Sequence, residues 1–112
     1  MADSRTGEAV PGGASTLDTV NALLAGTLME RMGIRFEAVS AGHLVASMPV
    51  AGNTQPYGLL HGGASCALAE TLGSSGATLH AATTGQVALG VEINASHHRA
   101  VSAGRVTGTA TA

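Results

Sequence analysis

One stretch of small and apolar residues constrains the fold of this chain more than any other part of its sequence. From His61 to about Leu79 the residues are mainly Ala, Leu, Gly and Ser, with one formally charged side chain, Glu70. A helix that is apolar on every side is typically buried rather than amphipathic. A buried carboxylate is costly unless it is paired or faces a wet cavity. The sequence therefore predicts a buried central helix over about 61–79 and a functional carboxylate within it.

Segments with strand-like alternation of apolar and polar residues lie on both sides of this helix. They are residues 34–38, 44–50, 87–94 and 105–111. We expect Ile34, Phe36 and Ala38 to share one face of the first strand, before a turn at Ser40-Ala41-Gly42. Strands wrapped around one buried helix define an α+β plan. The last strand is expected to leave one edge of the sheet open.

The first third of the chain predicts a leader and one further helix. Residues 1–15 are polar and rich in Gly, which indicates a flexible leader. Leucine and valine at helical spacing predict a helix over about 17–31, capped by Thr16 or Asp18 and stopped by Gly33. With 112 residues, the chain is long enough for one small domain, which we expect over 16–112.

Composition excludes several classes of function. Apolar residues make up 45% and charged residues 11%, which argues against disorder. The net charge is −2 and the five arginines are scattered, so no nucleic-acid partner is expected. Lysine is absent, which excludes Schiff-base chemistry. The lone Cys66, the absence of a signal-peptide pattern and the absence of an apolar run of ~18 residues predict a cytoplasmic protein without a membrane partner.

The start of the central helix is a candidate for polarising a carbonyl group. The first N–H groups of a helix have no intrahelical partner, and the helix dipole adds partial positive charge there. Gly62 and Gly63, after His61, would let a ligand approach these amides closely. Such donors suit a developing oxyanion. Gln55, in the preceding loop, could donate a hydrogen bond to the same carbonyl.

Glu70 has its own candidate partner and a distance problem. Ser74 follows it by four residues on the same helical face, where its hydroxyl could orient the carboxylate or a water. Gly62 lies eight residues before Glu70, about 12 Å along the axis at ~1.5 Å per residue. One substrate carbonyl cannot comfortably reach both ends of that span. Two antiparallel copies of the helix could bring them together, so a homodimer is predicted.

Histidine and cysteine are placed without the spacing of a metal site. His97, His98, His61 and Cys66 contain no ligand pair at helical or zinc-finger spacing. Neither a metal nor another cofactor is expected.

Two motifs together resemble a known family. Leu60-His61-Gly62-Gly63-Ala64-Ser65, Leu68-Ala69-Glu70-Thr71 and Gly73-Ser74 are similar to the central helix of the PaaI-like hotdog thioesterases. Val91-Glu92-Ile93-Asn94-Ala95-Ser96-His97, continuing to Gly104-Arg105-Val106, resembles the next two strands in one branch of that family. This branch contains the Glu-type 4-hydroxybenzoyl-CoA, 1,4-dihydroxy-2-naphthoyl-CoA and enterobactin-pathway proofreading thioesterases. The resemblance runs from about Leu17 to Ala112.

The resemblance implies a hotdog fold and hydrolysis of an aromatic acyl-CoA thioester. Glu70 would be the catalytic base or nucleophile, and Ser74 would assist water or Glu70. Gln55, His61 and the Gly62 or Gly63 amide would hold the carbonyl. Substrate contacts are implied at Gly63, Thr71, Gly90, His97 and Arg99, the last two near the CoA phosphates and pantetheine. Coenzyme A would be part of the substrate rather than a cofactor. By analogy, the homodimer would pair into a dimer of dimers, a homotetramer.

Four points remain open at the level of the sequence. The family domain normally continues for two more strands, which this sequence is expected to lack. A non-catalytic acyl-CoA-binding or regulatory hotdog protein could retain the helix start without needing Glu70. A hotdog hydratase would use a His near a Pro-containing helix start, whereas Gly-Gly follows His61 here. The acyl group is not identified, since Phe36 and Tyr57 are the only aromatic residues available for stacking.

Overall fold

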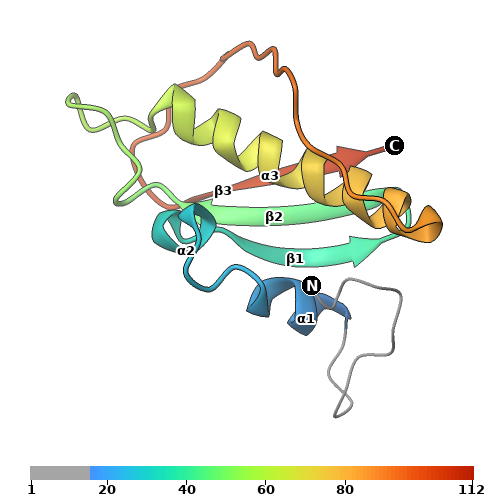
Figure 1. Cartoon of the computed structure of the whole chain (residues 1–112). Coiled ribbons are helices and arrows are strands. Elements are labelled where there is room, and N and C mark those ends of the chain that lie inside the picture. Colours follow the sequence, from blue (N-terminus) through green and yellow to red (C-terminus); the bar gives the residue numbers. More distant parts are fainter. Residues whose placement is uncertain (1–15) are drawn as a thin grey trace.

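A three-stranded antiparallel sheet with one long helix across it forms the frame of the molecule (Figure 1). The computed structural model describes residues 16–112, so the predicted leader lies outside the described residues. The elements are α1 (Thr16–Ala22), α2 (Leu28–Met32), β1 (Arg35–Ser40), β2 (His43–Pro49), α3 (Gly62–Ala81), the 3₁₀ turn η2 (Ala82–Thr84) and β3 (Arg105–Thr111). The strand order is β1-β2-β3. This arrangement confirms the predicted α+β plan with a long central helix.

The first helix is shorter than the sequence predicts. Instead of one helix over 17–31, α1 and α2 are separated by a turn in which Gly26 has φ +76°. Leu24 lies in this turn and is buried in the core. Gly33 stops α2 as expected, in the left-handed conformation with φ 75°. Helical spacing alone did not locate the break, because the apolar residues on both sides of it pack against the same core.

The hairpin of β1 and β2 contains an irregularity that changes which residues face inward. The register shifts between Phe36 and Ala38, which leaves Glu37 as the extra residue. Phe36 is buried, whereas Ala38 is exposed and Val39 takes the inward position. The expectation that Ala38 shares the face of Ile34 and Phe36 is therefore wrong. The bulge adds one residue and reverses the alternation after it.

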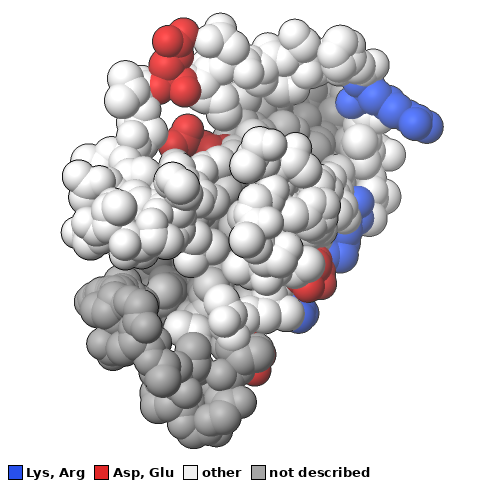
Figure 2. Space-filling view, turned by 90° about the vertical axis from the view of Figure 1, so that its right-hand side faces the viewer, with Lys and Arg blue, Asp and Glu red and all other residues white. Residues whose placement is uncertain are grey.

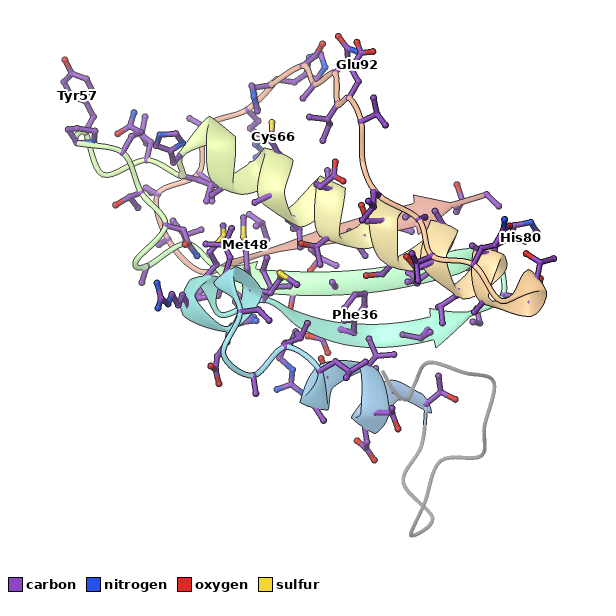
Figure 3. The ribbon with its side chains drawn as sticks, viewed as in Figure 1. Phe36, Met48, Tyr57, Cys66, His80 and Glu92 are labelled. Carbon is purple, nitrogen blue, oxygen red and sulfur yellow. The ribbon has the colours of Figure 1, made fainter. Side chains whose placement is uncertain are left out.

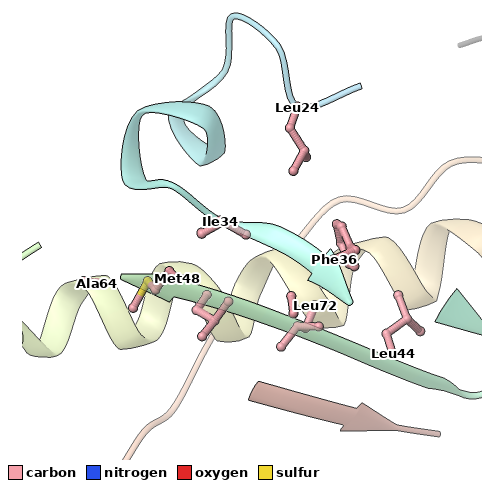
Figure 4. Packing of buried hydrophobic residues seen from close by; sticks show 9 residues of the cluster. Leu24, Ile34, Phe36, Leu44, Met48, Ala64 and Leu72 are labelled. Atoms are coloured by element: carbon pink, nitrogen blue, oxygen red, sulfur yellow. The ribbon is translucent and has the colours of Figure 1, made fainter. Parts of the chain in front are cut away.

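The core lies between the sheet and one side of α3 (Figure 4). Strand β2 supplies Leu44, Ala46 and Met48, each at most 3% exposed, as its alternation predicts. The helix supplies Ala64, Leu68 and Leu72. Close packing continues to β3, where a side-chain carbon at Gly108 would lie only 2.7 Å from Leu72 Cδ1. These contacts fix the rotation of α3 about its axis.

Helix α3 is not buried on every side, which corrects the prediction from its composition. Its buried residues are Ala64, Leu68, Thr71 and Leu72, all on or beside the face toward the sheet. Ala69, Gly73, Ala77 and Leu79 are exposed. Within residues 16–112, no helix has the length and apolar character needed to cross a membrane.

The segment predicted as a strand over 87–94 is extended but has no strand partner among the described residues. After η2 the chain turns back along α3 and arches over it before entering β3 (Figure 1). Val87, Leu89 and Val91 are 77%, 85% and 96% exposed. Strand β3 pairs only with β2 in residues 16–112. The alternation predicted an extended segment correctly, but a strand also needs hydrogen-bonding partners that the described sheet does not bring to it.

Candidate active site

The start of α3 is capped by the side chain that precedes it. His61 is the N-cap residue, and its Nδ1 accepts a hydrogen bond of 2.8 Å from the Gly63 N–H. Because Nδ1 accepts, the neutral ring carries its proton on Nε2, which is left as a donor. The Gly63 amide is therefore occupied and does not serve as a free donor. Gly62, at the first helical position, keeps an N–H without an intrahelical acceptor.

The side-chain carbonyl of Gln55 accepts hydrogen bonds within its own loop. Its Oε1 accepts from the Tyr57 N–H at 2.6 Å and from the Leu59 N–H at 3.3 Å. These bonds orient the side chain, whose NH₂ group can still donate. Tyr57, at the tip of this loop, is 89% exposed and points into solvent (Figure 3). Phe36 is in the core, so neither aromatic side chain lines a pocket near α3.

The middle of α3 holds the predicted carboxylate and hydroxyl together. Ser74 Oγ donates to Glu70 Oε2 at 2.5 Å. A charge-assisted O–H···O⁻ bond of this length is strong and orients the carboxylate. Thr71, predicted as a substrate contact, is instead buried, and its hydroxyl donates to the Ala67 carbonyl at 2.7 Å. The turn of about 100° per residue carries Thr71 away from the side on which Glu70 lies.

A pocket of about 270 Å³ lies between this part of α3 and the arching segment. Glu70 and Ser74 line it from the helix, and Gly90 lines it from the arch. Its remaining walls are largely apolar: Ala69, Ala77, Ala88, Leu89 and Ile93. We did not predict these wall residues from the sequence. The alternation over 87–94 was the available signal, because it places Ala88 and Gly90 on one side of the segment.

His97 and Arg99 lie in a second groove, of about 430 Å³, between α3, β3 and the end of the arch. His97 also reaches the start of α3, since a side-chain carbon at Gly62 would lie 3.1 Å from His97 Nε2. In the space-filling view, acidic and basic side chains lie on opposite sides of the hollow beneath the arch (Figure 2). The Glu70 pocket is lined by two carboxylates, Glu70 and Glu92, and by no Lys or Arg, whereas Arg99 lines the second groove.

The predicted site residues thus form three groups along α3. His61, Gly62 and Gln55 lie at or just before its start, Glu70 and Ser74 at its middle, and His97 joins the helix start to the second groove. Neither pocket is lined by Gln55, His61 or Gly62. In the part of the chain that the structure describes, no three His, Cys, Asp or Glu side chains form a group that could hold a metal ion.

An antiparallel sheet packed against one long helix is the arrangement of the hotdog fold. Residues 57–112 match the family model described as "Thioesterase superfamily", and the chain belongs to that family. It is 54% identical over 94 residues to the proofreading thioesterase EntH of Cronobacter turicensis, a match covering 83% of this chain and 68% of the relative.

Solved structures show the same likeness in three dimensions. A variant of thioesterase PA1618 from Pseudomonas aeruginosa superposes with a TM-score of 0.81 at 43% identity, over 88% of this chain and 71% of that one. Thioesterase HI1161 from Haemophilus influenzae gives a TM-score of 0.76 at 38% identity, over 88% and 68% of the two chains. The chain is therefore a thioesterase with a hotdog fold, and the substrates of its family are acyl-CoA molecules.

Proposed function

We propose that this chain hydrolyses an aromatic, hydroxybenzoyl- or hydroxynaphthoyl-like CoA thioester, with Glu70 as the catalytic carboxylate. The observation that carries the proposal is the Ser74–Glu70 hydrogen bond of 2.5 Å in a pocket with mainly apolar walls. Such a pocket suits a flat apolar acyl group, while the carboxylate supplies the chemistry. The walls are aliphatic, so an aryl group would pack against Leu89 and Ile93 rather than stack on an aromatic ring.

The chemistry needs a nucleophile and a site for the developing negative charge. As a general base, Glu70 would take a proton from water while the water oxygen attacks the thioester carbon. The carbonyl oxygen becomes an oxyanion, which the Gly62 N–H, His61 Nε2–H and Gln55 NH₂ groups would stabilise. Collapse of this intermediate breaks the C–S bond, and the CoA thiolate takes up a proton. As a nucleophile, Glu70 would instead attack the thioester carbon and expel the CoA thiolate, which forms a mixed anhydride that water then hydrolyses to the free acid and the Glu70 carboxylate.

The two parts of this machinery are too far apart on one helix. Eight residues separate Gly62 from Glu70, which is about 12 Å at ~1.5 Å per residue. We propose a homodimer in which α3 of each subunit runs antiparallel to its partner, and a dimer of dimers beyond it. A cytoplasmic location would fit acyl-CoA substrates.

A substrate panel tests the proposed function. The full chain should release thiol from benzoyl-, hydroxybenzoyl- and hydroxynaphthoyl-CoA with a higher kcat/KM than from short aliphatic CoA esters. Preference for the aliphatic esters would overturn the aromatic assignment while leaving the thioesterase class intact. Binding of the esters without release of thiol would favour a non-catalytic acyl-CoA-binding protein.

Subunit mixing tests the shared site. Glu70→Gln removes the carboxylate, and His61→Ala removes the cap and one donor. Each homomer should be impaired, whereas heterodimers should recover activity because one of their two sites keeps both functional halves. Absence of recovery, with heterodimers demonstrated by mass spectrometry, would place the complete site within one subunit.

A further inference from the structure

The backbone conformation of Gly90 does not require glycine. It does not appear among the glycines with positive φ, unlike Gly85 only five residues earlier, which has φ +72°. Any residue type could therefore adopt its backbone conformation. The reason for glycine must lie in what surrounds the Cα atom.

The Glu70 carboxylate occupies the space where a side chain at position 90 would begin. A Cβ built on Gly90 would collide with Glu70 Oε2 and would lie 2.8 Å from Glu70 Cδ and 3.1 Å from Oε1. No other heavy atoms are nearer to that position. Real Cβ atoms do not tolerate such contacts, so one partner would have to move. The far end of the flexible Glu70 side chain would move more easily than the backbone of the arch.

The arch is held in place on the N-terminal side of Gly90. The Gln86 N–H donates to the Ala81 carbonyl at 3.0 Å, and Thr78 Oγ1 donates to the Ala88 carbonyl at 3.4 Å. These two hydrogen bonds therefore fix the distance between the arch and α3 before the chain reaches Gly90. Ala88, two residues earlier on the same side of the segment, carries a methyl group there without difficulty.

From this geometry we infer that Gly90 is a positioning residue for Glu70, an inference that depends on the proposed function of Glu70. The same oxygen, Oε2, accepts the Ser74 hydroxyl and lies against Gly90. Ser74 and the bare Cα of Gly90 therefore confine Oε2 from two sides and leave Oε1 for the attacking water or the thioester carbon. This role differs from the substrate contact that the family resemblance implied for Gly90.

Gly90→Ala is the direct test. We expect kcat to fall ~10–10²-fold, because a displacement of about 1 Å in a reacting group has effects of this size. KM and the Kd of a non-hydrolysable acyl-CoA thioether should stay close to the parental values, as should the urea midpoint of unfolding. The matched control is Gly73→Ala on α3, which adds the same methyl group to the pocket wall at a point where a Cβ would meet no atom within 4 Å. Glu70 is not displaced there, so kcat should fall much less than in Gly90→Ala. A raised KM and Kd with an unchanged kcat would overturn the inference and make Gly90 a substrate contact.

A double-mutant cycle shows whether the effect passes through Glu70. Glu70→Asp withdraws the carboxylate by one methylene group, which leaves room for the methyl group of Gly90→Ala. Gly90→Ala should therefore cost less in a chain that already carries Glu70→Asp than in the parental chain. Equal fold-losses in both backgrounds would overturn the inference.

A readout independent of catalysis separates this inference from the proposed function. The ¹³C resonance of the Glu70 carboxyl carbon should move in Gly90→Ala and in Ser74→Ala, and stay in place in Gly73→Ala. If the parental chain hydrolyses no thioester but the resonance moves as expected, the proposed function fails and the positioning role stands. If hydrolysis is normal and Gly90→Ala leaves both kcat and the resonance unchanged, the positioning role fails alone.

Discussion

The two sides of α3 are built from chemically similar residues, but one side packs in the core and the other lines a pocket. Toward the sheet, Ala64, Leu68 and Leu72 are 7%, 6% and 3% exposed. On the outer side, Ala69, Gly73 and Ala77 are exposed and line the Glu70 pocket under the arch. Both sides are apolar, so polarity alone does not distinguish them. Side-chain size does, because leucine fills the core, whereas Ala, Gly and Ser leave space for a pocket.

This comparison implies that stability and activity can be changed separately on one helix. Substitutions on the sheet side should lower the free energy of unfolding, and substitutions on the outer side should lower turnover. A substitution that changed both equally would break the comparison.

The largest effect is expected from Leu72→Ala on the sheet side. Removing a side chain that is 3% exposed should lower the free energy of unfolding by about 2–5 kcal/mol, because it leaves a cavity beside Gly108. Urea denaturation measures the change. Leu79→Ala is the matched control on the same helix. Because Leu79 is 41% exposed, its replacement should lower the free energy of unfolding much less. Equal losses at the two positions would show that the core does not lie where the packing indicates.

Glu70→Gln tests the outer side. A neutral isostere retains shape and loses basicity, so kcat should fall at least ~10²-fold. The free energy of unfolding should not fall, because the carboxylate contributes no buried core contact. Thiol release and urea denaturation on the same preparation give both values. Near-parental turnover would remove Glu70 from the proposed mechanism.

Ser74→Ala should have a smaller effect on turnover than Glu70→Gln. Loss of a hydrogen bond to a charged group is worth about 1.5–3 kcal/mol when nothing replaces it. Water can replace the hydroxyl at this half-buried position, so a kcat loss of ~10-fold or less is expected. Thr71→Val is the matched control, because the Thr71 hydroxyl donates to the Ala67 carbonyl and does not reach the pocket. A larger loss of kcat in Thr71→Val than in Ser74→Ala would reverse their assignments.

A small loss of stability is expected at the helix start. His61→Ala removes the acceptor for the Gly63 N–H and should cost about 1 kcal/mol. His61→Asn keeps an N-cap acceptor and should retain stability, yet it loses the Nε2 donor. Comparing unfolding and kcat in the two variants separates capping from catalysis. If Asn restored both stability and turnover, His61 would serve the helix alone.

Several features of the fold follow from local sequence. The alternation of Leu44, Ala46 and Met48 predicted a strand face, and the left-handed Gly33 ends α2 where expected. The start of α3 and the Glu70–Ser74 spacing were also predictable, because a helix repeats every 3.6 residues. These features depend on residues that are close together in the chain.

Other features required the tertiary structure. Alternation predicted a strand over 87–94, but strand hydrogen bonds need a partner that the local pattern does not specify. The bulge at Glu37 moves Ala38 away from the core. It could not be predicted from one segment, because the register of a strand depends on how it pairs with its neighbour.

The sequence by itself determined the long helix, its single carboxylate and the hydroxyl one turn later. Only the tertiary structure decided that one side of this helix is covered and the other open, because both sides are apolar and packing against β2 and β3 sets the rotation. It also decided that Gly63 donates to His61 rather than to a ligand, and that Gly90 lies against Glu70. Gly90 and Glu70 are twenty positions apart in the chain, and such contacts depend on the path of the backbone between them, which no local pattern contains.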